Sequence, residues 1–308
     1  MKIVITGGAG FIGSHLAEFY HNRNEEVHII DDFSSGRIEN ISHLSRAIIH
    51  KGSITQESIL KKILENADIV FNFAAMVSVN ESLASPKECN EININGLINL
   101  LHAASENSVK KLIHSSSAAV YGDDEEMPKT ESMAASPKSP YGITKLCGEF
   151  YCKIFSDMRK IKTIALRYFN VFGPRQNPYS QYAAVIPVFI KRALEDQDII
   201  IYGDGNQTRD FIYVDDIIAA NLRAAENDEV KGVFNVANGK AVKILELAET
   251  IIQLTNSKSR IKFEQPRAGD IINSVAGIKN AEEALSFRPK VSLVEGLNNT
   301  IEYIKKQI

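Results

Sequence analysis

Tyr141 and Lys145 stand four residues apart, a spacing that places a phenol and an ammonium on one face of a helix. Ser139 and Pro140, just before them, are typical of a helix N-cap and first turn. A phenol with a pKa of about 10 is a poor base at neutral pH. The Lys145 cation and the positive end of the helix are expected to lower that pKa, so that Tyr141 can take and return a proton. The spacing also occurs by chance in many helices and is weak by itself.

A second chemical signal is the glycine-rich segment GAGFIG, which begins at Gly8 between a short apolar run and a helical pattern. Gly8 permits a tight turn, Gly10 lets the backbone approach a pyrophosphate, and Gly13 allows close packing of helix on strand. The first N–H groups of the helix would then face the phosphates. Asp31 follows at about the 20-residue distance expected of a carboxylate that binds ribose hydroxyls. The segment predicts a dinucleotide site that favours NAD, and Arg37 leaves NADP as an alternative.

These residues must be positioned by an alternation of strands and helices through the first half of the chain. Strands are expected at 2–6, 26–31, 47–52, 68–75, 111–117 and 163–167, and helices at 13–22, 86–106 and 140–155. Strands that are apolar on both faces and alternate with helices indicate a parallel sheet covered on both sides. We therefore expect an α/β fold with a doubly wound parallel sheet of the Rossmann type. Ser115, Ser116 and Ser117 end one strand, where ligand-facing groups of such a sheet lie.

The second half is less regular and is expected to form a smaller, interleaved α/β lobe. Helices are expected at 182–194, 243–255 and 292–305, with a turn at 203–205. Strand-like runs at 211–214 and 233–236 are expected to return to the first sheet. We therefore expect a dinucleotide-binding domain over 1–170, to which segments near 211–240 return, and a substrate-binding lobe mainly over 171–308.

Composition excludes several classes of protein. The 308 residues include 35 basic and 38 acidic side chains, a net charge of −3, which argues against a partner that is a nucleic acid or a membrane surface. The three cysteines form no CxxC pair, so neither a disulfide framework nor a metal site is expected. No apolar run reaches the roughly 20 residues of a membrane span, and because a glycine turn follows after only a few residues, no signal peptide is expected at the start. We expect a cytoplasmic protein.

Taken together, these motifs resemble the extended short-chain dehydrogenase/reductases, and in particular the nucleotide-sugar epimerase/dehydratase group with its UDP-glucose and UDP-N-acetylglucosamine 4-epimerases. The resemblance covers essentially the whole chain. It rests on residues 7–13, Asp31, 73–75, Asn93, 115–122, Tyr141 with Lys145, 167–170 and 203–211. It implies NAD as the cofactor, bound by Gly7, Gly10, Phe11, Ile12, Gly13, Asp31, Asp32, Ser53, Ile54, Phe73, Ala74, Ala75, Asn93, Tyr141, Lys145 and Tyr168. Ser53 replaces an aspartate that often contacts adenine in similar enzymes.

The resemblance also implies a UDP-sugar site and a catalytic set. Tyr141 would transfer the proton, Ser117 would hydrogen-bond the sugar hydroxyl, and Lys145 would also bind the nicotinamide ribose. Two guanidinium groups, of Arg209 and Arg267, suit a diphosphate. The full substrate-binding set is Ser78, Ser117, Tyr141, Asn170, Ala184, Val185, Tyr202, Arg209, Arg267, Asp270 and Ser274.

The residues after Ser117 narrow the reaction. Similar dehydratases have an Asp-Glu pair before Val-Tyr-Gly and similar decarboxylases a glutamate, whereas this chain has Ala118 and Ala119. Alanine cannot transfer a proton, which favours a 4-epimerase that oxidises and reduces one carbon of a UDP-hexose. The alternatives are epimerisation of a UDP-uronic acid, a net NAD-dependent dehydrogenase or reductase, and an NAD-binding regulator without turnover.

Two further expectations follow from the resemblance. The helices at 86–106 and 140–155 mirror those that form an intermolecular four-helix bundle in similar enzymes, which predicts a homodimer. Ser274 matches a position that borders the sugar 2-substituent, where a tyrosine accompanies enzymes confined to plain hexoses. The small side chain predicts that N-acetylated UDP-hexosamines are accepted, alongside UDP-glucose and UDP-galactose.

Overall fold

The computed structural model describes residues 1–158, 161–178, 184–266 and 272–307. Its main sheet has seven parallel strands in the order β10-β6-β5-β4-β1-β2-β3. The strands are β1 (Lys2–Thr6), β2 (Glu26–Asp31), β3 (Ile48–Lys51), β4 (Ile69–Asn72), β5 (Lys111–Ser117), β6 (Lys162–Tyr168) and β10 (Gly232–Val236). The expected parallel sheet is confirmed, and every strand expected in the first half is present.

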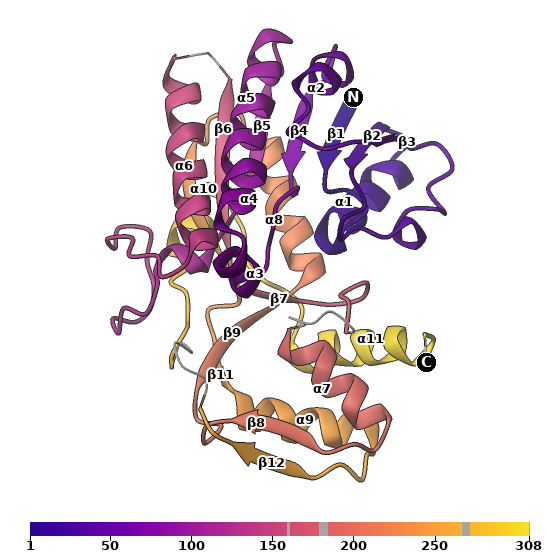
Figure 1. The fold of residues 1–308 in the computed structure, drawn as a ribbon, viewed down its shortest axis with the longest axis vertical. Helices are drawn as coiled ribbons and strands as arrows, with labels where there is room; N and C mark the ends of the chain where they lie inside the picture. The colour runs from indigo at the N-terminus through magenta and orange to yellow at the C-terminus, as the bar shows by residue number, and fades with distance from the viewer. Residues whose placement is uncertain (159–160, 179–183, 267–271, 308) are drawn as a thin grey trace.

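Helices cover both faces of this sheet, which confirms the doubly wound fold (Figure 1). One face packs against α1 (Phe11–Asn22), α8 (Val214–Glu226) and α10 (Lys279–Leu285), and the other against α2 (Glu57–Ile63), α5 (Gly96–Glu106) and α6 (Pro140–Met158). Successive side chains of β1 point to opposite faces, so Ile3 and Ile5 join the first core and Val4 the second. Among the described residues, no helix is long and apolar enough to span a membrane.

The smaller lobe lies beyond the carboxyl ends of the main-sheet strands (Figure 1). It contains a three-stranded sheet, β11-β9-β7, and a two-stranded sheet, β12-β8. Its elements are β7 (Asn170–Phe172), α7 (Val185–Leu194), β8 (Ile199–Tyr202), β9 (Thr208–Tyr213), β11 (Ala241–Lys243), α9 (Ile244–Thr255), β12 (Ile261–Glu264) and α11 (Leu293–Lys305). The three helices and both sheets share one apolar core. This core faces the main sheet across β9.

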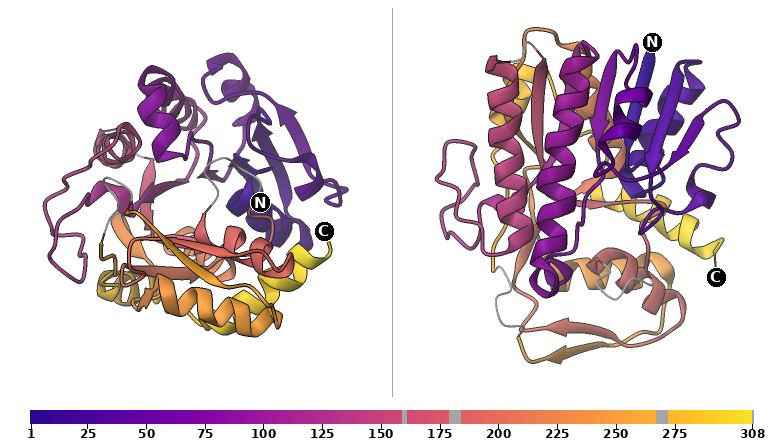
Figure 2. Two further views of the ribbon diagram at one scale, coloured as in Figure 1. Left: turned by 60° about the horizontal axis from the view of Figure 1, so that its bottom comes forward. Right: turned by 45° about the horizontal axis from the view of Figure 1, so that its top comes forward.

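The second half of the chain returns to the main sheet, as expected, but by only one of the two expected strands. The run at 233–236 forms β10, which pairs with β6. Of the run expected at 211–214, residues 211–213 instead belong to β9 in the three-stranded sheet and Val214 begins α8, which corrects the expectation. These β9 residues alternate between the cores, with Phe211 and Tyr213 in the small lobe and Ile212 in the main core. Figure 1 and the right-hand view of Figure 2 show α8 and α10 on the far side of the sheet from α5 and α6.

The long helix expected at 86–106 is interrupted. The structure has α4 (Pro86–Asn90), a π-helical segment η2 (Glu91–Asn95) and then α5, so the helical path continues with one widened stretch. Asn93 lies in η2 and is buried. Its amide exchanges two hydrogen bonds with the backbone of Met76, the N–H to Oδ1 at 2.8 Å and Nδ2 to the carbonyl at 3.0 Å. The widened turn accompanies an asparagine that is tied to the strand-end loop.

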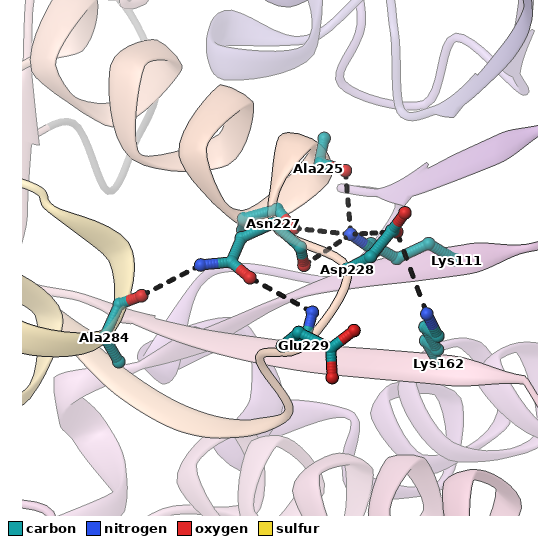
Figure 3. A network of polar contacts seen from close by, with 8 residues as sticks. Lys111, Lys162, Ala225, Asn227, Asp228, Glu229 and Ala284 are labelled. Carbon is teal, nitrogen blue, oxygen red and sulfur yellow. Dashed lines mark hydrogen bonds and ion pairs between the residues drawn. The ribbon is translucent and has the colours of Figure 1, made fainter.

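A buried lysine closes the main sheet at the end opposite the small lobe. Lys111 begins β5, and its Nζ donates to the carbonyl oxygens of Ala224 (3.2 Å), Ala225 (2.8 Å) and Asn227 (2.7 Å) at the end of α8 (Figure 3). Asp228 adds an ion pair at 3.3 Å. The last carbonyls of a helix need partners, and an ammonium there also opposes the negative end of the helix dipole. Lys111 therefore joins β5 to the end of α8.

Candidate functional site

Three consecutive serines at the end of β5 meet three residues of α6. Tyr141 hydrogen-bonds Ser117, Lys145 donates from Nζ to the carbonyl oxygen of Ser115 at 2.8 Å, and Ser116 donates from Oγ to a carboxylate oxygen of Glu149. Tyr141, Lys145 and Glu149 follow one another at intervals of four residues, so they occupy one face of α6. Each of these three residues of α6 therefore contacts a different one of the three serines. The three residues expected to be catalytic are therefore brought together.

The electrostatics of this pair differ from the expectation. Burial raises the pKa of Tyr141, because the phenolate loses solvation, and the hydrogen bond with Ser117 acts in the opposite direction. The Nζ of Lys145 lies 5.7 Å from the centroid of the Tyr141 ring. Burial also lowers the pKa of Lys145 to about 8, which weakens it as a permanent cation. The expected lowering of the tyrosine pKa is thus wrong for this structure, because the loss of solvation outweighs the hydrogen bond with Ser117.

The glycine turn between β1 and α1 has the geometry that a dinucleotide requires. Gly7 has φ +66°, and a Cβ on it would lie 2.7 Å from the Ala74 nitrogen. A Cβ on Gly13 would lie 2.3 Å from the Gly7 oxygen, so α1 packs directly on the turn. Gly10 is the N-cap of α1 and provides no side-chain cap, and the first turn holds no acidic residue. The N–H groups from Phe11 and Ile12 onward are therefore at a helix end suited to phosphate.

Asp31 lies beside this turn, at the carboxyl end of β2. It is buried, and its two oxygens accept hydrogen bonds from the N–H groups of Ala9 and Phe33, each at 2.9 Å. Burial raises the pKa of Asp31 and these two bonds oppose that rise. Each carboxylate oxygen can accept a further hydrogen bond. A Cβ on Gly36 would lie 2.5 Å from Oδ1, so position 36 must stay small for Asp31 to be reached.

Two open hollows flank the predicted adenosine end of the site. One, of about 460 Å³, is lined by Phe33, Gly36, Arg37, Ile38, Glu39 and Lys51, and the other, of about 400 Å³, by Asp32, Lys51, Gly52, Ser53, Thr55 and Gln56. Ser53 accepts hydrogen bonds from Thr55, and Ile54 is buried beneath the surface. Asp32 and Ser53 are thus close together, as a shared ligand requires. The residues present fit an NAD molecule.

Other residues expected to bind the cofactor use their polar atoms within the protein. Phe73, Ala74 and Ala75 follow β4 and are half-buried beside Gly7. Asn93 holds Met76 and also donates to Thr144 Oγ1 at 3.0 Å. The Tyr168 hydroxyl lies 3.0 Å from Oδ1 and 2.9 Å from Nδ2 of Asn221 on α8. Asn93 and Tyr168 therefore support the site through contacts with the protein itself.

The residues expected to bind the UDP-sugar come from both lobes. Ser78 caps α3 (Val79–Ala84), accepting from the Glu81 N–H at 3.1 Å, while Ala184 and Val185 begin α7. Asn170 on β7 and Arg209 on β9 lie on neighbouring strands, and Tyr202 ends β8. Ser274 is half-buried in a segment tied to β9 through Ile272 and Ala276. Arg267 and Asp270 lie outside the described residues.

The sequence reasoning missed two buried acids that organise this region. Asp210 is fully buried and accepts hydrogen bonds from the N–H groups of Asn238 (2.9 Å), Gly239 (3.0 Å) and Ala276 (3.1 Å), and burial raises its pKa to about 6. Glu149, 5% exposed, lies one turn beyond Lys145 on the same face of α6 and pairs with Arg167. A repeat of the four-residue spacing beyond Lys145 was the available signal for Glu149. Nothing in the local sequence marks Asp210.

Comparison with known proteins agrees with this geometry. Residues 3–237 match the family described as the NAD dependent epimerase/dehydratase family. A relative from Methanocaldococcus jannaschii named putative UDP-glucose 4-epimerase is 35% identical, over 98% of both chains. The structure of a UDP-N-acetylglucosamine 4-epimerase from Methanobrevibacter ruminantium in complex with UDP-N-acetylmuramic acid is 42% identical, with TM-score 0.96 over 100% and 99% of the chains. A UDP-glucuronic acid 4-epimerase from Bacillus cereus, in complex with UDP-glucuronic acid and NAD, is 33% identical, with TM-score 0.92 over the full length of both.

Proposed function

We propose, from the premise that this chain belongs to the NAD dependent epimerase/dehydratase family, that it interconverts the two C4 epimers of a UDP-hexose. Its relatives include UDP-sugar 4-epimerases, and the chain is accordingly an isomerase that uses NAD. The particular sugar and the roles of individual residues are the proposal. The observation that carries it is the cluster of Ser117, Tyr141 and Lys145. Beside this cluster, the two residues that follow Ser117 in the sequence are Ala118 and Ala119.

This cluster suits reversible proton transfer at one hydroxyl group. The Tyr141 hydroxyl takes the proton of the sugar 4-hydroxyl and later returns it, and the Ser117 hydroxyl orients both groups. Among the described residues Lys145 donates one hydrogen bond, to the Ser115 carbonyl, which leaves two ammonium donors for a ribose. NAD held at the glycine turn and Asp31 would supply reversible hydride transfer at C4, with return to the opposite face of the sugar. Ala118 and Ala119 carry no group that could expel water or assist decarboxylation, so the sugar leaves with all its atoms.

UDP-hexosamines that carry an N-acetyl group at C2 are proposed to be accepted, alongside UDP-glucose and UDP-galactose. A relative 42% identical was determined with UDP-N-acetylmuramic acid, which carries such a group, and this supports the proposal. In this chain the corresponding expectation rests on Ser274. Ser274→Tyr should suppress conversion of UDP-N-acetylglucosamine and leave UDP-glucose conversion largely intact. Equal losses on both sugars would exclude this role of Ser274.

A UDP-uronic acid is the second candidate substrate, favoured by the 33% identical relative that was determined with UDP-glucuronic acid. The deciding experiment is product analysis by NMR after incubation with UDP-N-acetylglucosamine, UDP-glucose and UDP-glucuronic acid, each in a separate reaction. The proposed reaction yields the C4 epimer with no net change in the NADH absorbance band. A net NADH signal would instead identify a dehydrogenase, and no product from any sugar would contradict the proposed function.

A homodimer remains part of the proposal, with a second copy of this chain as the partner. Apolar side chains 48–75% exposed follow one stripe of α6, namely Ile143, Phe150, Ile154 and Met158. A stripe at this spacing fits another helix. Sedimentation velocity on the parent and on Phe150→Glu checks this: the parent should sediment as a dimer and the variant as a monomer. A monomeric parent would refute it.

A further inference from the structure

Glu149 is a buried carboxylate on the catalytic face of α6 that the proposed chemistry does not use. It lies two helical turns beyond Tyr141 and one beyond Lys145. Arg167 on β6 binds it through two hydrogen bonds, Nε to Oε1 at 2.8 Å and Nη2 to Oε2 at 2.7 Å. The remaining partner is the Ser116 hydroxyl, which also donates to Oε1. Glu149 thus joins α6 to β6 through Arg167 and to the end of β5 through Ser116.

The arginine of this pair is itself held from the other side. The guanidinium carbon of Arg167 lies 4.8 Å from the centroid of the Tyr121 ring, and Arg167 is 5% exposed. The Tyr121 hydroxyl donates to Oδ1 of the fully buried Asn235 on β10 at 2.6 Å. Asn235 Nδ2 in turn donates to the carbonyl oxygens of Lys129 (2.8 Å) and Gly277 (3.1 Å). The position of Glu149 is therefore fixed from β6 and β10, independently of α6.

A buried ion pair of this kind is weak support for stability, because apolar residues of similar volume often serve as well. Its contribution is instead to fix the position of α6 along the sheet. Apolar packing tolerates a small slide of a helix along a sheet, whereas two parallel hydrogen bonds to a planar guanidinium allow one arrangement. The Ser116 bond then transfers that arrangement to the strand that carries Ser115 and Ser117.

We propose that Glu149 is a positioning residue for the proposed epimerisation, on which this inference rests: through Ser116 it fixes the register of α6 on β5, so that the Tyr141 hydroxyl meets Ser117. Proton transfer is sensitive to such placement, and a displacement of about 1 Å can cost roughly 100-fold in rate. Loss of the Ser116–Glu149 bond is expected to weaken the Tyr141–Ser117 bond. Because that bond opposes the raised pKa of Tyr141, its weakening should raise the pKa further.

The test compares Ser116→Ala with Thr163→Val. Ser116→Ala removes the bond to Glu149 and leaves the Glu149–Arg167 pair intact. Thr163 on β6 is a matched control, since its buried hydroxyl also joins the sheet to α6, donating to the Cys152 carbonyl oxygen at 2.7 Å, away from the catalytic end. Both variants lose one buried sheet-to-helix hydrogen bond, so similar falls in Tm are expected.

Only Ser116→Ala should change the catalytic end. We expect kcat to fall about tenfold with KM within about twofold, and the acid limb of the kcat–pH profile to move to higher pH. Ionisation of Tyr141 can also be followed without turnover, as the tyrosinate absorbance that disappears in a matched Tyr141→Phe version. Cys89 and Lys145, the titratable groups beside Tyr141, are unchanged in both variants.

The outcomes separate the two proposals. Parental kcat, pH profile and tyrosinate titration in Ser116→Ala would overturn the positioning role, as would equal shifts in Thr163→Val. An inactive parent would overturn the proposed function, and the tyrosinate titration would then still show whether Ser116 controls the phenol of Tyr141.

Discussion

A buried lysine lies at each end of β5: Lys111 begins the strand, and Lys145 of α6 contacts Ser115 near its other end. The contrast between them distinguishes a lysine that stabilises the fold from one that is available to a ligand. Lys111, 1% exposed, uses all three ammonium hydrogens on carbonyl oxygens and has Asp228 nearby. Lys145, 3% exposed, makes one hydrogen bond in the described part of the chain, to Ser115. An ammonium that is saturated stabilises a fold. One that is buried and largely unsaturated costs stability and is expected where a ligand completes it.

The surroundings of the two lysines agree with this contrast. Burial lowers the pKa of both, but Asp228 opposes the effect at Lys111, whereas no carboxylate opposes it at Lys145. Other buried groups at the Lys145 end also lack partners among the described residues, including Nε2 of His114. In the described part of the chain two of the four such groups, His114 Nε2 on β5 and Arg167 Nη1 on β6, lie near Lys145, whereas those of Arg175 and Gln176 follow β7.

The largest effect is expected at the catalytic end. Tyr141→Phe removes the titrating hydroxyl and keeps the ring, so turnover should fall about 100- to 10,000-fold, the range typical of general acid–base catalysis. NAD content and Tm should stay close to those of the parent. The measurement is steady-state epimerisation with NAD quantified after denaturation. A variant that retains the parental rate would remove Tyr141 from the mechanism.

Lys145→Met should lower the activity and also reduce the dependence of stability on pH. Activity is expected to fall at least about tenfold. The pKa of Lys145 is about 8 in the fold against 10.5 in the unfolded chain, so between these values only the unfolded chain is protonated at this site. Stability of the parent should therefore rise by up to about 3 kcal/mol as pH increases from about 8 to 10.5. Urea unfolding at several pH values should show a smaller rise in Lys145→Met; an identical rise in both proteins would contradict the lowered pKa.

Lys111→Met should give the opposite pattern. Three carbonyl oxygens at the end of α8 lose their donor, and the expected destabilisation is about 1–3 kcal/mol. The kcat of the folded protein should be unchanged, because the catalytic serines lie at the far end of β5. Urea unfolding and kcat measured on the same preparation check both parts. A fall in kcat at full folding would break the separation between the two ends.

The smallest effect is expected from Asp228→Asn. Asp228 is 75% exposed, so solvent screens its attraction to Lys111. The pKa of Asp228 is lowered below 3.8 by Lys111, so its contribution is present above pH 3.8 and is lost as pH falls through its folded pKa. The variant should be slightly less stable than the parent at neutral pH and equal to it in acid. A loss as large as that of Lys111→Met would mean that the ion pair, rather than the carbonyl contacts, holds this end.

Local signals in the sequence predicted the main sheet and the residues that meet at its carboxyl edge. The glycine turn, Asp31 and the four-residue spacing of Tyr141 and Lys145 are short-range patterns with direct physical causes. The widened turn at Asn93 was not predictable, because it accompanies contacts with Met76 and Thr144 that are distant in sequence. The placement of β9 and the pKa of Tyr141 depend on burial in the assembled fold, which no local pattern reports.

The return of α8, β10 and α10 to the main sheet limits how this fold can evolve. Because the chain passes between the lobes repeatedly, no single pair of cut points releases the smaller lobe intact. Gene fusion or recombination between relatives could not exchange that lobe as a module without also breaking the β6–β10 pairing. A new sugar preference would have to be acquired by substitution in place, at proposed sugar-binding positions such as Ser274, within a scaffold that is inherited whole.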